Sequence, residues 1–111
     1  MKMVNRGFMV CRPKQSFWNW ANQQPETVMP FDEGDGVEPS IYLIEEDFME
    51  EEPVLEQHFK KVFKNELSTV NSDESAWPEK LTLELFHEWF EVVMGSTVFD
   101  TQKSDLLSEK F

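Results

Sequence analysis

Residues 81–100 constrain the fold most, because the hydrophobic pattern changes its period within this one stretch. Its first half has apolar residues at helical spacing, namely Leu85, Phe86, Trp89 and Phe90. This spacing predicts an amphipathic helix. Residues 92–99 are mostly β-branched or aromatic, which favours a strand. An amphipathic helix that is followed directly by an apolar strand contributes to the hydrophobic core. We therefore expect this stretch to lie in the interior.

Two earlier segments predict further strands. Residues 6–12 form a short apolar run that Pro13 closes, and residues 40–45 form another. Both segments carry apolar side chains on both faces of the expected strand. Each strand is therefore either covered on both sides or presents a face that meets another chain. With a helix in the connection, the two strands could also form a right-handed parallel unit.

The connection between these strands is expected to begin with a short helix. Ser16 is a good N-cap residue and predicts a helix over residues 17–23. In that helix Phe17 and Trp20 face the core, whereas Trp18 points away from it. Because tryptophan is enriched in binding hot spots, Trp18 is a candidate partner-binding residue. The alternative is a ring that folds back on its own domain.

A long helix is predicted over residues 53–70. Its apolar stripe consists of Leu55, Phe59, Val62, Phe63 and Leu67. Thr82 is expected to cap the final helix. The resulting order is strand, helix, strand, helix, helix, strand, which predicts one α+β domain over residues 1–111 with a small three-stranded mixed sheet and three helices. Residues 24–39, rich in proline, glycine and acids, are expected to form a mobile acidic loop.

Charge is distributed very unevenly along the chain. The net charge is −12, and residues 26–59 contain twelve acids and no lysine or arginine. Residues 1–25 contain four basic residues and no acid. Because such a chain repels phosphate backbones and anionic lipids, we expect it to bind neither nucleic acid nor membranes directly.

The acidic block before the long helix is the second candidate partner-binding site. It contains Glu45, Glu46, Asp47, Glu50, Glu51 and Glu52. One interpretation is a solvated helix N-terminus, where carboxylates complement the helix dipole. The other is a docking surface for a basic protein partner, because complementary charge speeds encounter and excludes wrong partners.

Other candidate sites are weak. Glu84 and His87 have the spacing of a Glu-x-x-His metal pair, but both are predicted to face solvent and the chain has no second pair. Residues 32–36 resemble a calcium loop with glycine at two ligand positions. His58 or His87 could serve a small enzyme together with carboxylates, although no catalytic motif accompanies either one. We therefore expect no cofactor, no metal site and no catalytic residue.

A cytoplasmic location is expected from the sequence. The chain has no apolar run of about 18 residues and no signal-peptide pattern at its start. Its single cysteine, Cys11, cannot form an internal disulfide and suits a reducing compartment. Because Met9 and Val10 precede it, Cys11 is expected to be a buried structural thiol.

The chain also contains several aromatic and charged motifs, namely Arg12-Pro13-Lys14-Gln15, Phe17, Trp20, Tyr42-Leu43-Ile44, Trp77-Pro78, Phe86, Trp89-Phe90 and Val98-Phe99-Asp100. In these motifs it resembles a family of short, acidic, uncharacterised bacterial proteins. The resemblance covers most of the chain, and it implies a bacterial cytosolic protein. It implies no activity, ligand or catalytic residue, because these motifs are structural.

These observations favour a non-catalytic module that binds a basic protein, either as an immunity-type or antitoxin-like inhibitor or as an adaptor. Two alternatives stay open: a nucleic-acid mimic whose carboxylates occupy a DNA-binding cleft, and a small enzyme that uses His58 or His87. A homodimer through the sheet or through Trp18 is a separate expectation.

Overall fold

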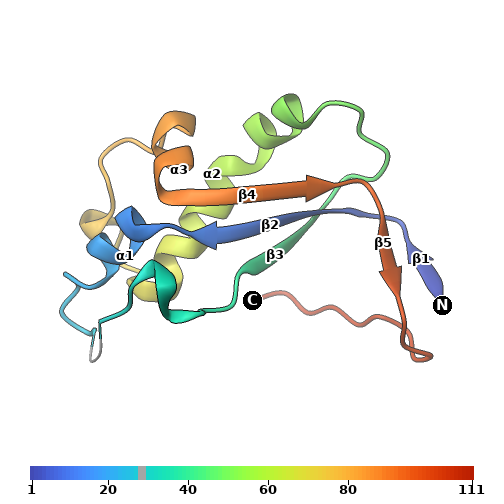
Figure 1. The fold of residues 1–111 in the computed structure, drawn as a ribbon, viewed down its shortest axis with the longest axis horizontal. Coiled ribbons are helices and arrows are strands. Elements are labelled where there is room, and N and C mark those ends of the chain that lie inside the picture. Colours follow the sequence, from blue (N-terminus) through green and yellow to red (C-terminus); the bar gives the residue numbers. More distant parts are fainter. Residues whose placement is uncertain (28–29) are drawn as a thin grey trace.

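The computed structural model describes residues 1–27 and 30–111, and its architecture is α+β, as predicted (Figure 1). The helices are α1 (Gln15–Ala21), α2 (Glu51–Val70) and α3 (Leu83–Trp89), with short 3₁₀ turns η1 (Glu33–Asp35) and η2 (Glu74–Ala76). The strands are β1 (Lys2–Val4), β2 (Gly7–Pro13), β3 (Ser40–Ile44), β4 (Phe90–Gly95) and β5 (Val98–Asp100). Within the described residues, no helix has the length and apolar composition needed to cross a bilayer.

The main sheet has the strand order β3-β2-β4, and both of its pairings are antiparallel. Met9 pairs with Tyr42 of β3 on one side and with Met94 of β4 on the other. The mixed sheet and the parallel unit expected from the strand-helix-strand order are therefore wrong. The reason is that α1 has only seven residues and ends near the β2 terminus, so the long connection returns the chain beside β2 in the opposite direction.

The last predicted strand is divided in two. β4 ends at Gly95 and β5 begins at Val98, and β5 pairs with β1 rather than extending the main sheet. The registers on either side of the break differ by one residue, so residues 5–7 lie opposite residues 96–97. Because pairing stops on both strands, β1 and β5 form a separate two-stranded sheet. Figure 1 shows β1 and β5 turning away from the main sheet at this point.

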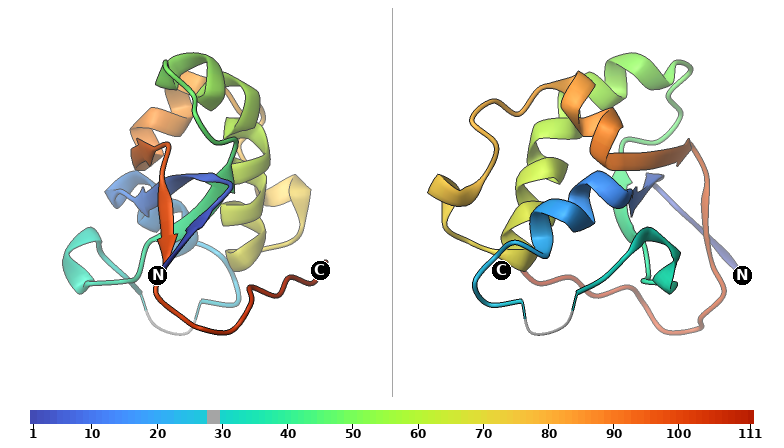
Figure 2. Two further views of the ribbon diagram at one scale, coloured as in Figure 1. Left: turned by 90° about the vertical axis from the view of Figure 1, so that its right-hand side faces the viewer. Right: turned by 60° about the vertical axis from the view of Figure 1, so that its left-hand side comes forward.

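Helices α2 and α3 pack on one face of the sheet and enclose an aromatic core (Figure 2). Phe63 of α2 is fully buried, and its ring meets Phe86, Trp89 and Phe90 at centroid distances of 5.6, 5.7 and 5.5 Å. These three partners come from the helix-to-strand stretch of residues 81–100. The Thr82 hydroxyl accepts a hydrogen bond from the Leu85 amide at 3.2 Å, which confirms the predicted cap.

Helix α1 begins at Gln15, and Lys14 occupies the N-cap position without a side-chain hydrogen bond, so the prediction that Ser16 caps this helix is wrong. Gln15 instead ties the helix to the acidic loop. Its backbone N–H donates to the Glu33 carboxylate at 3.2 Å, and its side-chain amide donates to Asp32 at 3.2 Å. The predicted loop of residues 24–39 contains η1, and residues 28–29 of the predicted loop lie outside the described residues.

Candidate functional site

Strand β3 is an edge of the sheet, and it separates two groups of exposed carboxylates (Figure 1). Before β3 stand Asp32, Glu33, Asp35 and Glu38; after it stand Glu45, Glu46, Asp47, Glu50, Glu51 and Glu52. All ten are exposed. Among the described residues β3 pairs only with β2, so its other edge offers unpaired backbone groups.

The face of the sheet away from the helices is apolar. Ile41 and Leu43 of β3 are 66% and 54% exposed, and Val93 of β4 is 52% exposed. Across the ladder, Phe8 pairs with Leu43 and Val10 with Ile41, so the five side chains share one face. We call this set the open face. None of them belongs to the core cluster, whereas Met9 and Cys11, their neighbours on β2, are fully buried in it.

The acidic block divides into two structural parts. Glu51 and Glu52 lie in the first turn of α2, where a carboxylate favours the positive end of the helix dipole. Residues 45–50 form the turn between β3 and α2, in which Asp47 has a left-handed backbone with φ of 57°. Phe48 in this turn is half-buried and packs against the core. The block therefore contains a helix N-terminus and exposed carboxylates, and its interpretation as a docking surface stays a prediction.

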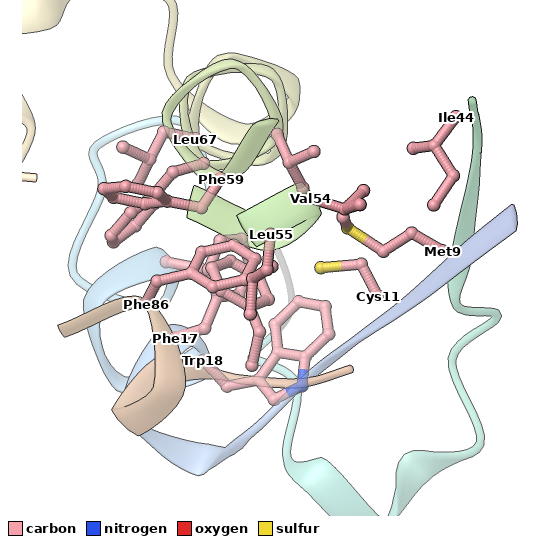
Figure 3. Close-up of a cluster of buried hydrophobic side chains, with 14 residues drawn as sticks. Met9, Cys11, Phe17, Trp18, Ile44, Val54, Leu55, Phe59, Leu67 and Phe86 are labelled. Carbon is pink, nitrogen blue, oxygen red and sulfur yellow. The ribbon is translucent and has the colours of Figure 1, made fainter. Parts of the chain in front are cut away.

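Trp18 does not project into solvent, so its prediction as an exposed partner-binding residue is wrong. Its side chain is only 8% exposed, and Figure 3 shows it among the core side chains on the side of Cys11. The centroid of its ring lies 5.2 Å from that of Phe17 and 5.5 Å from that of Phe31 in the acidic loop. Sequence periodicity missed this packing because a loop residue, Phe31, helps to cover the side of α1 that the helical pattern assigns to solvent.

A groove of about 590 Å³ runs between β3 and α2. Its walls are the β3 residues 40–44, then His58, Lys61, Val62 and Asn65 of α2, and Phe111 near the chain end. Most of the surface inside the groove is apolar. The groove lies along the strand whose outer backbone is unpaired, and His58 on its wall also borders a second hollow that is lined by Glu45 and Glu46 of the acidic block.

His58 and Glu45 form a close pair at one end of this groove. The His58 Nε2 lies 2.6 Å from the Glu45 Oε1. A hydrogen bond to the backbone amide of Glu45 itself, and then the bond to His58, hold the pKa of the Glu45 carboxyl below its ordinary value. No hydrogen bond within the described residues joins His58 to a serine, a cysteine or a tyrosine, so the imidazole has an acidic partner but no activated nucleophile.

A buried polar cluster forms the wall between this groove and the core. The Tyr42 hydroxyl donates to Glu66 at 2.5 Å and accepts from the Asn65 amide at 2.9 Å. Glu66 is 5% exposed, and burial raises the pKa of the Tyr42 phenol and of the Cys11 thiol. Both groups are therefore neutral at physiological pH. Sequence analysis missed this cluster, although a glutamate four residues after Val62 on the apolar stripe of α2 was the available signal.

The remaining histidine, His87, lies on the exposed side of α3. Glu84 and His87 are both exposed on α3, as predicted, and the Lys14 side chain donates only to the His87 backbone carbonyl at 2.8 Å. Across residues 1–27 and 30–111, no three His, Cys, Asp or Glu side chains gather in a way that could hold a metal ion.

Comparison with protein-family models, with curated proteins and with solved structures gives no match to this chain. The resemblance to short acidic bacterial proteins therefore stays a prediction.

Proposed function

We propose that the protein is a non-catalytic cytoplasmic module that binds a basic protein partner on the open face and the carboxylates around β3. The observation that carries the proposal is the placement of Ile41 and Leu43, which are exposed on an edge strand between two groups of acids. A stable interface combines a desolvated apolar centre with a polar rim. The open face supplies the centre, and the ten carboxylates supply a rim that is mostly acidic. Two exposed arginines adjoin this rim, Arg6 beside Glu45 and Glu46 and Arg12 beside Glu33 and Glu38.

A basic partner fits this surface better than a second copy does. Two copies that meet through the open face bring two acidic rims together, and like charges at an interface cost several kcal/mol, about the strength of a few hydrogen bonds. Residues 26–59 contain no lysine or arginine, so the two neighbouring arginines, Arg6 and Arg12, face ten carboxylates in each copy. A homodimer through the sheet is therefore the weaker proposal, and a basic inhibitor target or adaptor partner is the stronger one.

The test uses a partner captured from the native cytosol and a matched pair of charge-reversal variants. One variant changes Glu38, Glu46 and Glu50 to Lys around β3. The control changes Glu74, Glu79 and Glu88 to Lys, which alters the net charge equally but lies away from β3. We expect the first variant to weaken binding at least about tenfold and to flatten its salt dependence, while the control keeps both. Equal losses in the two variants would refute the surface assigned here.

The two versions of the proposal make different predictions. If the partner is a nuclease or another DNA-binding protein whose cleft the carboxylates occupy, duplex DNA competes with the protein for that partner. If the partner is a basic toxin, co-expression restores the growth of cells that produce the toxin. Both outcomes agree with the acidic surface, and they separate mimicry from simple inhibition.

A second candidate function, a small enzyme, uses the same groove. His58 stands there with Tyr42 and Ser40 on its walls, and its close contact with Glu45 is the arrangement that orients a general base. The test is turnover of a nitrophenyl ester and a nitrophenyl phosphate. If the wild type is active, His58→Ala is inactive and His87→Ala keeps the activity, the proposal of an enzyme is correct and that of a binding module is wrong.

A further inference from the structure

The segment of residues 101–111 is held at its beginning by Lys2. Within the described residues, no hydrogen bond holds residues 106–111. The Lys2 ammonium donates to the backbone carbonyls of Lys103 and Ser104 at 3.3 and 3.0 Å, and it lies 3.8 Å from the Asp105 carboxylate. Leu106 borders a small hollow with Met3 of β1. Figure 1 shows the segment then turning back beneath the sheet, and Figure 2 shows its end near the lower end of α2.

The far end of the same segment reaches the groove between β3 and α2. Phe111 is one of the residues that border this groove, together with Leu43 and Val62, yet its ring is fully exposed. An exposed phenylalanine next to an apolar groove gains stability if it enters the groove, because its apolar surface leaves water. The segment thus has one anchored end and one apolar end that lies at an unfilled site.

We propose that residues 107–111 are an intramolecular strap that seats Phe111 in the β3–α2 groove and covers the edge of β3. This inference rests on the proposed function in one respect: the closed strap competes with the basic partner for β3. Lys110 and Glu109 of the strap carry opposite charges, so the strap competes with the partner through the apolar ring of Phe111 and by covering β3.

The strap acts within one molecule rather than between two. A tether as short as residues 107–110 gives the ring an effective concentration in the millimolar range at the groove. Exchange of the segment between two copies instead requires two chains of net charge −12 to approach each other. Closure in cis is therefore expected to be independent of protein concentration.

The test compares Phe111→Ala with Leu107→Ser in the isotopically labelled full chain. Leu107 is the control, because it is an exposed apolar residue in the tether of the strap and lines neither the β3–α2 groove nor the hollow beside Met3. We expect Phe111→Ala to shift the amide resonances of residues 40–44 and to speed their hydrogen exchange, whereas Leu107→Ser leaves them unchanged. In the wild type, the Phe111 ring should show nuclear Overhauser contacts to the Leu43 and Val62 methyl groups.

Two results would overturn the strap. Shifts confined to residues 107–111 in the Phe111→Ala variant would mean that the ring never enters the groove. Contacts that disappear on dilution, or that appear between differently labelled copies, would assign the groove to a second chain.

The consequence for binding is measured separately. If the strap is closed in about nine molecules of ten, Phe111→Ala raises the affinity for the captured partner about tenfold, because the open form is no longer a minor state. Unchanged affinity with intact contacts in the free protein would show that the strap exists but does not compete. Failure of the charge-reversal test would reject the partner surface and leave the contacts in the free protein to decide the strap on their own.

Discussion

The two faces of the main sheet are similar in composition and opposite in environment. On the helix side, Met9 and Phe90 are buried and join one continuous core with the aromatic rings of α2 and α3. On the open side, Ile41, Leu43 and Val93 are more than half exposed. Antiparallel sheets with one solvated face usually carry polar side chains on it. Here the solvated face is apolar, and the acids are gathered at its two ends.

This difference separates two uses of apolar residues. The helix side already provides a closed core, with a polar cluster that is fully hydrogen-bonded, so the open face is not needed to complete the interior. A contiguous exposed apolar patch with a charged rim marks an interaction site. Stability should therefore depend on the helix side, and binding should depend on the open side.

The largest predicted effect is Phe63→Ala on the helix side. Removing a fully buried ring that packs against three others should lower the free energy of unfolding by about 3–5 kcal/mol. Ile41→Thr, which keeps a β-branched residue on the open side, should change it by less than about 0.5 kcal/mol. Urea denaturation measures both. A large decrease in the free energy of unfolding on Ile41→Thr would mean that the open face belongs to the folding core. It would refute the contrast between the two faces.

Two glycines test the same contrast at the backbone: Gly7 begins β2, and Gly95 ends β4. A Cβ on Gly7 would lie 2.7 Å from the carbonyl oxygens of Glu45 and Gly95, so Gly7→Ala must move backbone and should cost about 1–3 kcal/mol. A Cβ on Gly95 would instead collide with the end of the Phe8 ring. That ring lies on the open face and can rotate into water. Gly95→Ala should therefore cost less than Gly7→Ala and displace the Phe8 resonances, and the reverse order would show that the open face is tightly packed.

Tyr42→Phe tests the polar cluster on the helix side of β3. It removes the hydroxyl that donates to buried Glu66, and an unsatisfied buried acceptor costs about 1–3 kcal/mol. The loss should be visible in urea denaturation at neutral pH. Val93→Thr on the open side is the control and should change stability little. Equal stability of Tyr42→Phe and the wild type would mean that water replaces the phenol at Glu66.

The raised pKa of Tyr42 also predicts a stability profile in base. A folded-state pKa above the unfolded value means that the contribution is complete below about pH 10, the ordinary pKa of tyrosine, and is lost as the pH rises above it. Cys11 acts in the same direction from about pH 8.5. In a Cys11→Ala background, Tyr42→Phe should flatten the decline above pH 10. A decline of the same slope in both proteins would assign it to other groups.

The helix side was largely predictable from sequence because its signals are periodic and local. The stripe in residues 55–67 and the cap at Thr82 need no knowledge of distant residues, and both are confirmed in α2 and α3. The antiparallel pairing of β2 and β3 depends on where a long connection leads the chain, which no local pattern contains. Trp18 was misplaced for the same reason, because Phe31 from a loop forms part of its environment.

The candidate site was predictable only in part. The uneven charge identified the acidic block, and the apolar residues on both faces of residues 40–45 indicated that one face would need a cover. What the sequence did not contain is that the acids before and after β3 lie at the two ends of one exposed edge strand. The buried partnership of Tyr42 and Glu66 was also hidden, since it joins a strand and a helix that are 24 residues apart.

The smallest predicted effect concerns Glu45, which directly follows β3. His58→Gln should raise the pKa of the Glu45 carboxyl toward its ordinary value but not all the way, because the hydrogen bond to the Glu45 backbone amide remains and is the larger cause of the lowered pKa. A lowered folded-state pKa stabilises the fold above the unfolded pKa of about 4.3, and this contribution is lost as the pH falls through the folded value. His58→Gln should thus slightly reduce the loss of unfolding free energy on acidification, whereas His87→Gln should leave this loss unchanged. A carboxyl titration by NMR in both variants separates the cases, and a Glu45 pKa that does not move in His58→Gln would mean that the imidazole is not bound to this edge of the sheet in solution.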